Sequence, residues 1–297
     1  MTTAVLLFSN ALNAHIQRDL SVMDKLKALE SNIEERVGVF AINTANDCTI
    51  EYRAKEVFPT GCTSKVIGVS AVLKKSMSDP SLLLTNIKYS EEELNEWSPV
   101  TRKYVTTGMT IQDLCAASIS FSDNTSMNLL LKIIDGVQGM NDFAQSIGDL
   151  SFRQDNDWPA EAFSGGVNNL KDSSTPKSMV ESLRKLTIGE ILDKPQRDLL
   201  ITWLINTQTG ASRIRSAIPN NWVVGNKTGT GAVYGSTNDL AIVWPPNHAP
   251  ILIGIYYTSN NEHAKKREDI VANATRILIE EFVNDDKTLV HYKKMLK

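Results

Sequence analysis

The sequence predicts an α+β fold in which one antiparallel sheet is built from both ends of the chain and carries an all-helical insertion. β-prone runs lie near the N-terminus, within residues 36–53, and again near the C-terminus, within residues 222–257. Between them, from Cys62 to about Thr207, the pattern is helical. This order of elements predicts a five-stranded antiparallel sheet flanked by helices.

The N-terminal elements follow from local periodicity. Residues 21–35 carry apolar side chains at a helix-like spacing on one face, which predicts the first helix. Residues 36–42 and 48–53 are β-prone, and turn-forming residues at 43–47 join them. This arrangement predicts a hairpin.

The helical block contains one segment of different character. Residues 66–74 predict an apolar helix that runs on from Cys62, and residues 109–113 offer a helix start of the capping-box type. Residues 151–176, by contrast, are rich in Asp, Asn, Gly, Ser and Pro without a sustained period. They predict a long surface loop, and a loop of that length in a compact domain is usually functional.

Strand character returns near the C-terminus, at residues 222–225, 239–244 and 251–257. A final helix is expected over about residues 268–283. The predicted domains are therefore a discontinuous α/β lobe, residues 20–57 and 208–290, and an all-α lobe, residues 58–207, that contains the long loop.

Composition excludes several classes of function. The 297 residues are 42% hydrophobic and carry a formal net charge of −3, so the chain can bury a large core but has no basic stripe for nucleic acid. No stretch approaches the roughly 18 apolar residues that a membrane span requires. The cysteines, Cys48, Cys62 and Cys115, lack metal-ligand spacing, so neither a metal nor another cofactor is expected. Residues 1–11 contain a short apolar patch without a preceding Lys or Arg, which leaves export open.

The first chemical motif is Cys62-Thr63-Ser64-Lys65. If Cys62 opens a helix, Lys65 lies one turn further on the same face and brings its amine beside the thiol. A helix N-terminus and a nearby cation both favour a thiolate, although a neutral Lys65 could instead take the thiol proton itself. By itself, a Cys three residues before a Lys is more often chance than a catalytic pair.

Two further motifs follow in the chain. Ser122-Asp123-Asn124 lies between helical stretches, where a hydroxyl and an amide can face outward while Asp123 satisfies backbone groups. Lys227-Thr228-Gly229 follows a strand-like run, and Gly229 would let a substrate approach the strand edge closely.

With these three motifs the chain resembles the class A β-lactamases, which carry Ser-x-x-Lys, Ser-Asp-Asn and Lys-Thr-Gly. The resemblance covers roughly residues 20–285 and includes the runs Phe58-Pro59, 104–110, 121–130, 172–176 and 222–231, in the family's order. It implies a β-lactamase-like fold, a small-molecule β-lactam or related acyl substrate, a monomer, and a periplasmic or secreted location, with the cytoplasm not excluded. The family's disulfide is absent, because Cys115 matches one partner and the other falls near Val69.

The resemblance also implies a role for each matched residue. Cys62 stands where the family has its acylating serine, and the backbone N–H groups of Cys62 and Thr230 would form the oxyanion hole. Lys65 would tune the nucleophile, and Ser122 would pass a proton to the leaving nitrogen. The implied substrate-binding residues, for a side-chain amide and a carboxylate, are Asn124, Lys227, Thr228, Gly229, Thr230 and, as a further candidate, Arg215.

Two departures from the family pattern affect hydrolysis. The nucleophile is a cysteine, and Trp158 stands where the family has the glutamate that activates the deacylating water. Asp157 and Glu161 are nearby carboxylates that could substitute if they reach that water. We therefore predict a β-lactam hydrolase that acts through an acyl-enzyme on Cys62. The alternatives are an acyltransferase that passes the acyl group from the thioester to an amine, and a β-lactam-binding or sensing protein that does not hydrolyse.

Overall fold

A central antiparallel sheet organises the molecule, and a computed structural model describes residues 22–30, 35–159 and 170–294 of it. The strand order is β2-β1-β9-β8-β7, and every neighbouring pair is antiparallel. The strands are β1 (Glu35–Asn43), β2 (Cys48–Tyr52), β7 (Val223–Thr230), β8 (Thr237–Trp244) and β9 (Ile251–Ser259). The predicted α+β fold and the five-stranded sheet built from both termini are thus confirmed. The export question at residues 1–11 and the candidate Glu161 both fall outside the described residues.

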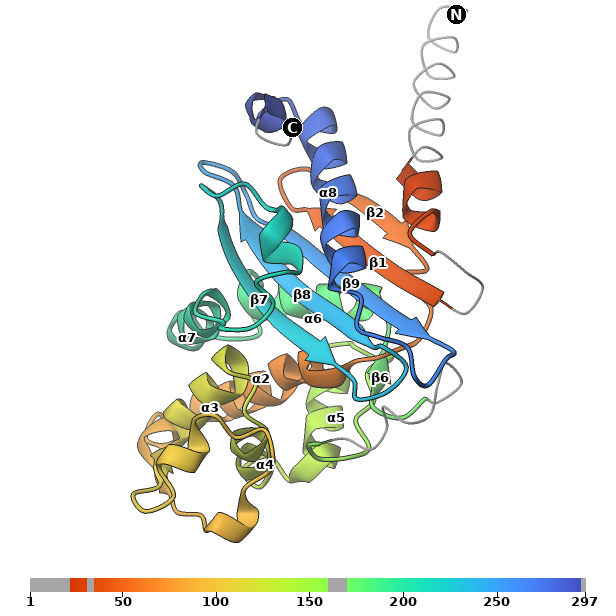
Figure 1. Cartoon of the computed structure of the whole chain (residues 1–297). Helices are drawn as coiled ribbons and strands as arrows, with labels where there is room; N and C mark the ends of the chain where they lie inside the picture. The colour runs from red at the N-terminus through yellow and green to blue at the C-terminus, as the bar shows by residue number, and fades with distance from the viewer. Residues whose placement is uncertain (1–21, 31–34, 160–169, 295–297) are drawn as a thin grey trace, which may run out of the picture.

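Helices cover both faces of the sheet (Figure 1). The long helix α8 (Glu268–Asp285) lies across one face, and its buried side chains form one apolar core with the sheet. Helix α6 (Pro176–Thr187) packs on the opposite face against β1 and β9. Gly254 of β9 permits this approach, because a Cβ there would lie 2.6 Å from a methyl carbon of Val180.

The helical insertion is built around α2 (Lys65–Ser76), whose side chains are almost all buried. The helices α3 (Ile111–Ser120), α4 (Asn124–Leu131) and α5 (Gly136–Ser146) pack on it. Helix α3 begins where the capping pattern predicts, since Thr110 accepts a hydrogen bond from the backbone N–H of Asp113 at 3.1 Å. Figure 1 shows this group of helices gathered beside the sheet.

The helix α7 (Lys194–Ile205) contacts both α3 and the edge strand β7. Helices α6 and α7 both lie within the predicted all-α lobe and yet touch the sheet, so the lobe boundaries remain a prediction. In the described ranges no helix is long and apolar enough to cross a membrane.

Short elements connect the larger ones. The two-residue strands are β3 (Phe58–Pro59), which pairs with β6 (Ser173–Ser174), and β4 (Asn86–Ile87), which pairs with β5 (Met109–Thr110). The 3₁₀ turns are η1 (Gly61–Ser64), η2 (Leu82–Leu84), η3 (Glu91–Glu93), η4 (Thr101–Lys103), η7 (Ile214–Ala217) and η8 (Val290–Lys294). The β3–β6 pair matters for the site because it ties the chain before Cys62 to the end of the long loop.

Candidate active site

Cys62 lies in the 3₁₀ turn η1, directly before α2. Side-chain hydrogen bonds fix this turn, from the Thr63 hydroxyl to the Thr60 carbonyl at 2.6 Å and from the Ser64 hydroxyl to the Gly61 carbonyl at 2.8 Å. Gly61 adopts a φ of 56°, a conformation that glycine reaches without steric cost. The neighbours of Cys62 in the turn are buried while Cys62 is only partly so, and the turn therefore presents the thiol at its surface.

Lys65 is the first residue of α2, and its side chain is fully buried. Its Nζ donates to the carbonyl oxygens of Ser122 and Asp123, at 2.8 and 3.1 Å, and to Oδ1 of Asn124 at 2.7 Å. An ammonium has three protons to donate, so these three oxygens match its charged form. Burial lowers the pKa of Lys65, while the charges of Cys62 and Asp123 act in the opposite direction.

Ser122 and Lys227 meet across the site although they lie 105 residues apart. The Lys227 Nζ donates to the Ser122 hydroxyl at 2.8 Å and to the Thr228 carbonyl at 3.0 Å. Lys227 is fully buried, and burial lowers its pKa to about 7 against the opposing charges of Cys62 and Asp239. Ser122 has a left-handed backbone with a φ of 58°, so its carbonyl meets Lys65 while its hydroxyl meets Lys227.

The surroundings of Cys62 favour a thiolate. Burial alone would raise the pKa of the Cys62 thiol. The charges of Lys65 and Lys227, together with hydrogen bonding by Ser122 and Lys65, outweigh burial and bring the pKa below its ordinary value. Cys115 provides the contrast, because burial without such partners raises the pKa of its thiol far above the ordinary value.

Strand β7 forms one edge of the sheet and runs beside the nucleophile turn. A Cβ at Gly229 would lie 2.5 Å from the Thr60 carbonyl oxygen and 3.2 Å from a methyl carbon of Thr63. Only glycine therefore lets β7 approach η1 this closely. Because an edge strand leaves one row of backbone groups unpaired, the N–H of Thr230 at the end of β7 is suited to receive a ligand atom.

Trp158, in the long loop, packs against the Lys65 side of the site. Its side chain is 2% exposed, and the Lys65 Nζ lies 5.4 Å from the centre of its ring. The side chain of Asn128 holds its backbone on both sides, accepting from the Trp158 N–H at 2.9 Å and donating to its carbonyl at 2.5 Å. Asp157, the candidate substitute base, is exposed in the same loop.

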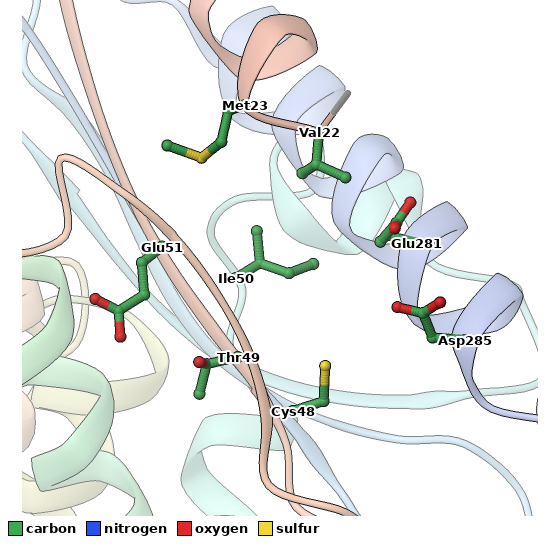
Figure 2. A pocket seen from close by; sticks show the side chains of 8 residues that line it. All are labelled: Val22, Met23, Cys48, Thr49, Ile50, Glu51, Glu281 and Asp285. Carbon is green, nitrogen blue, oxygen red and sulfur yellow. The ribbon is translucent and has the colours of Figure 1, made fainter. Parts of the chain in front are cut away.

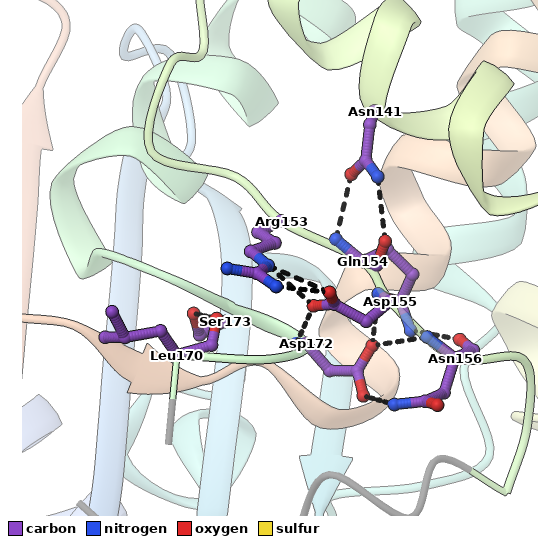
Figure 3. A network of polar contacts seen from close by, with 8 residues as sticks. All are labelled: Asn141, Arg153, Gln154, Asp155, Asn156, Leu170, Asp172 and Ser173. Atoms are coloured by element: carbon purple, nitrogen blue, oxygen red, sulfur yellow. Dashed lines mark hydrogen bonds and ion pairs between the residues drawn. The ribbon is translucent and has the colours of Figure 1, made fainter. Parts of the chain in front are cut away.

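The described ends of the long loop, 151–159 and 170–176, are tied together by a polar network (Figure 3). The Asp172 carboxylate accepts the backbone N–H groups of Asp155 and Asn156, at 2.7 and 3.0 Å, and the Asn156 side-chain amide at 2.8 Å. Arg153 pairs with Asp155 at 2.6 Å. This network fixes the chain segment that presents Trp158.

One cavity lies apart from this cluster of residues. It has a volume of about 360 Å³ and lies among β2, the helical turn at residues 22–28 and α8 (Figure 2). Its lining residues are Val22, Met23, Cys48, Thr49, Ile50, Glu51, Glu281 and Asp285. None of them belongs to the cluster around Cys62.

Comparison with known proteins agrees with this geometry. The family model described as "Beta-lactamase enzyme family" matches residues 21–282. The chain is 42% identical over 259 residues to the carbapenem-hydrolysing β-lactamase KPC of Klebsiella oxytoca. The aligned region covers 87% of this chain and 88% of that protein. It is also 42% identical over 284 residues to the β-lactamase Toho-1 of Escherichia coli, covering 95% and 96%. The chain belongs to the β-lactamase enzyme family.

The structure of this class A β-lactamase shows a buried cation beside strand β7 that sequence reasoning missed. Arg213 is buried, and its guanidinium donates to the Thr230 hydroxyl at 2.7 Å and to the Gly229 carbonyl at 2.9 Å. The candidate Arg215 instead donates to the Val224 carbonyl at 2.9 Å and to Oδ1 of Asn226 at 3.0 Å, further back along β7. The two arginines are two residues apart, and nothing in the sequence distinguishes them.

A second residue that the sequence reasoning missed, Asp239, lies fully buried behind Lys227 in this β-lactamase. It stands at the start of an apolar run in β8, and a charge in such a run needs buried partners. That position was the one available signal in the sequence. The other predicted residues, Lys65, Ser122, Asn124, Lys227 and Thr228, lie together around Cys62.

Proposed function

We propose that this class A β-lactamase opens the amide bond of β-lactams through an acyl-enzyme on Cys62, and that hydrolysis of the resulting thioester is its slow step. The observation that carries the proposal is the pair of buried lysines, Lys65 and Lys227, whose charges act on the Cys62 thiol. A thiolate is the reactive form of cysteine, and a neighbouring cation increases its fraction at neutral pH.

The acylation step follows from the contacts at the site. The thiolate attacks the β-lactam carbonyl carbon, a C–S bond forms, and the backbone N–H groups of Cys62 and Thr230 receive the oxyanion. When the C–N bond breaks, the leaving nitrogen takes the Ser122 hydroxyl proton, which the Lys227 ammonium 2.8 Å away replaces. The hydrogen bonds that Lys65 donates to three oxygens support the charged form of Lys65 and argue against its use as a base.

Substrate binding is proposed to involve strand β7, which carries Lys227. We propose that Lys227, Thr228 and Thr230 bind the substrate carboxylate on β7, and that Gly229 allows the close approach. The contact between Arg213 and the Thr230 hydroxyl supports Arg213, in preference to Arg215, as the guanidinium that contributes to this charge. Asn124 is proposed to hold the substrate's side-chain amide.

The described residues around Cys62 assist deacylation less than they assist acylation. Hydrolysis of the thioester needs a water molecule and a base within hydrogen-bond reach of it. Trp158 brings a neutral aromatic ring to this side of the site, and Asp157 is exposed in the loop. Asp157 remains the candidate base, and its use would require it to reach a water at Cys62.

A second candidate function is transfer of the acyl group to an amine. Two observations favour it: a thioester reacts readily with amines, and Trp158 leaves hydrolysis with little assistance. In this reaction the amine nitrogen attacks the carbonyl carbon, the C–S bond breaks and the thiolate is regenerated. The proton that the amine loses returns through Ser122 to Lys227, which gave up a proton during acylation. The third candidate, a β-lactam-binding or sensing protein, requires no covalent step.

Intact-mass spectrometry after mixing with benzylpenicillin tests the proposal. We expect a one-to-one adduct that forms on the wild-type chain but is absent from Cys62→Ala. Slow loss of the adduct with release of penicilloate supports hydrolysis. Loss that occurs only after addition of hydroxylamine supports transfer. A wild-type chain that binds benzylpenicillin without forming any adduct would contradict both covalent functions.

A further inference from the structure

Asp239 is a buried carboxylate whose charge acts on Lys227, one of the proposed carboxylate-binding cations. It is 0% exposed and lies opposite Thr228 in the β7–β8 register. Its Oδ1 accepts from the Asn226 side-chain amide at 2.9 Å, and its Oδ2 accepts from the Ile214 backbone N–H at 3.2 Å. A buried carboxylate is costly unless such donors and opposite charges compensate for lost hydration.

Both donors are chain neighbours of a cation. Asn226 precedes Lys227 in β7, and Ile214 follows Arg213 at the start of η7. One carboxylate therefore links the strand that carries the lysine to the turn that carries the arginine. The arginine in turn donates to the Gly229 and Asn238 carbonyls, at 2.9 and 2.8 Å, which fixes its guanidinium against the end of β7.

Three elements bring charged or titratable side chains near Asp239. Lys227 approaches Asp239 from β7. Arg213 lies directly before η7 and Arg215 lies within it, and the neutral phenol of Tyr256 approaches from β9. Burial raises the pKa of Asp239 to about 6, although Arg213 and Lys227 act to lower it. Burial lowers the pKa of Lys227 to about 7, and the Asp239 charge acts to raise it, while Lys65 and Arg213 act in the same direction as burial.

We propose that Asp239 is a positioning residue for substrate recognition: its ionised carboxylate keeps Lys227 charged and holds the Arg213 turn against β7. This inference rests on the proposed binding of a β-lactam carboxylate by these cations. Asp239 itself touches no substrate, since it is fully buried behind Lys227.

The sign of the pH effect follows from the two groups. Below a pH of about 6, Asp239 is protonated in the wild type, so removing its charge by substitution changes little. Above that pH, Asp239→Asn leaves Lys227 without its counter-charge, and the pKa of Lys227 falls further. A fall of about one unit would weaken carboxylate binding by up to about tenfold near pH 8, because one unit corresponds to a factor of ten in protonation.

The experiment measures the second-order rate constant for acylation of Cys62 by benzylpenicillin and by its methyl ester, from pH 5 to pH 8. For Asp239→Asn we expect a rate equal to wild type at pH 5 and about tenfold lower at pH 8 with the acid, and a smaller loss with the ester, for which the Lys227 charge acts only on Ser122 and Cys62. Asp286→Asn, which removes a buried carboxylate that binds Asn43 and His248, is the matched control and should show no such dependence.

An independent measurement separates this inference from the proposed function. In ¹⁵N-lysine-labelled protein, the Lys227 resonance, assigned with Lys227→Arg, should titrate at lower pH in Asp239→Asn than in wild type. If this shift occurs but benzylpenicillin does not acylate the protein, the coupling between Asp239 and Lys227 is supported and the proposed function is contradicted. An unchanged Lys227 titration, or an equal loss of rate with acid and ester at all pH values, would overturn the inference. If Asp239→Asn does not fold, the acid-to-ester rate ratio of the wild type alone must stay constant through pH 6, where Asp239 ionises, and fall only near pH 7 as Lys227 loses its proton. A fall that begins below pH 6 would overturn the inference.

Discussion

The two walls that flank Cys62 differ in chemistry. On one wall Lys65, Ser122 and Lys227 form a connected set of charged and hydrogen-bonded groups, each with a defined partner. The second wall is the long loop next to Lys65, where Trp158 presents an aromatic ring whose indole Nε1 has no hydrogen-bond partner among the described residues. In the proposed mechanism the first wall forms the acyl-enzyme, whereas in the described part of the second wall the only candidate base, Asp157, is exposed. If this proposal holds, the two half-reactions depend on different segments of the chain and can be lost separately.

The largest expected effect comes from returning a carboxylate to the second wall. We expect Trp158→Glu to shorten the lifetime of the benzylpenicillin adduct by about 10²-fold, because a positioned general base typically contributes that much or more. The rate of adduct formation should change far less. Both are measured by intact-mass spectrometry after rapid mixing and quenching.

Trp158→Phe is the matched control, because it replaces the indole with a smaller aromatic ring and adds no base. Its adduct should persist as in wild type. If Phe and Glu shorten the lifetime equally, then access of water limits release, and the contrast between the two walls is one of space instead of charge.

A smaller effect is expected from moving the first wall. Gly229→Ala places a Cβ against the Thr60 carbonyl, where only 2.5 Å is available, so β7 must shift away from Cys62. We expect acylation to slow by about tenfold or more, since small misplacements of reacting groups have effects of up to about 10²-fold. The adduct once formed should not be released faster, because the Thr230 N–H at the end of β7 would serve the oxyanion in deacylation as well.

Gly225→Ala, on the same strand, controls for the loss of stability. Its Cβ would meet the Leu204 side chain at 3.1 Å, at the α7 end of β7 and away from the nucleophile turn. It should lower the melting temperature without slowing acylation. Equal slowing by both substitutions would mean that strand stability, and not the approach to Cys62, determines the rate.

The smallest expected effect is a shift in the pH dependence of thiol reactivity. The pKa of Cys62 is lowered, so its alkylation by iodoacetamide should reach half-maximum at a pH below that of an ordinary thiol, about 8.5. Lys227→Gln removes one of the responsible charges and should move this midpoint upward. Cys115, whose pKa is raised by burial, should stay unreactive in the folded chain and serves as the internal reference. A Cys62 midpoint at or above the ordinary value would show that burial outweighs the lysines.

Sequence reasoning succeeded where a local pattern determines the outcome. The β-prone runs and turn residues near both termini predicted the five strands, and the capping pattern at Thr110 predicted the start of α3, because these depend on neighbours within a few residues. It named Arg215 as the candidate cation and did not consider Arg213. Both are alike in local sequence, and the choice depends on which guanidinium faces Thr230 across a turn.

The sequence by itself determined the family fold, the order of the three motifs, and the two departures at Cys62 and Trp158. Those are matters of residue type and spacing, which a linear chain carries directly. The charge state of the site was decided only by the tertiary structure. Lys65 and Lys227 become buried groups whose charges act on Cys62, and the charge of the buried Asp239 acts on Lys227, because folding brings groups that lie far apart in the chain together and removes water from them.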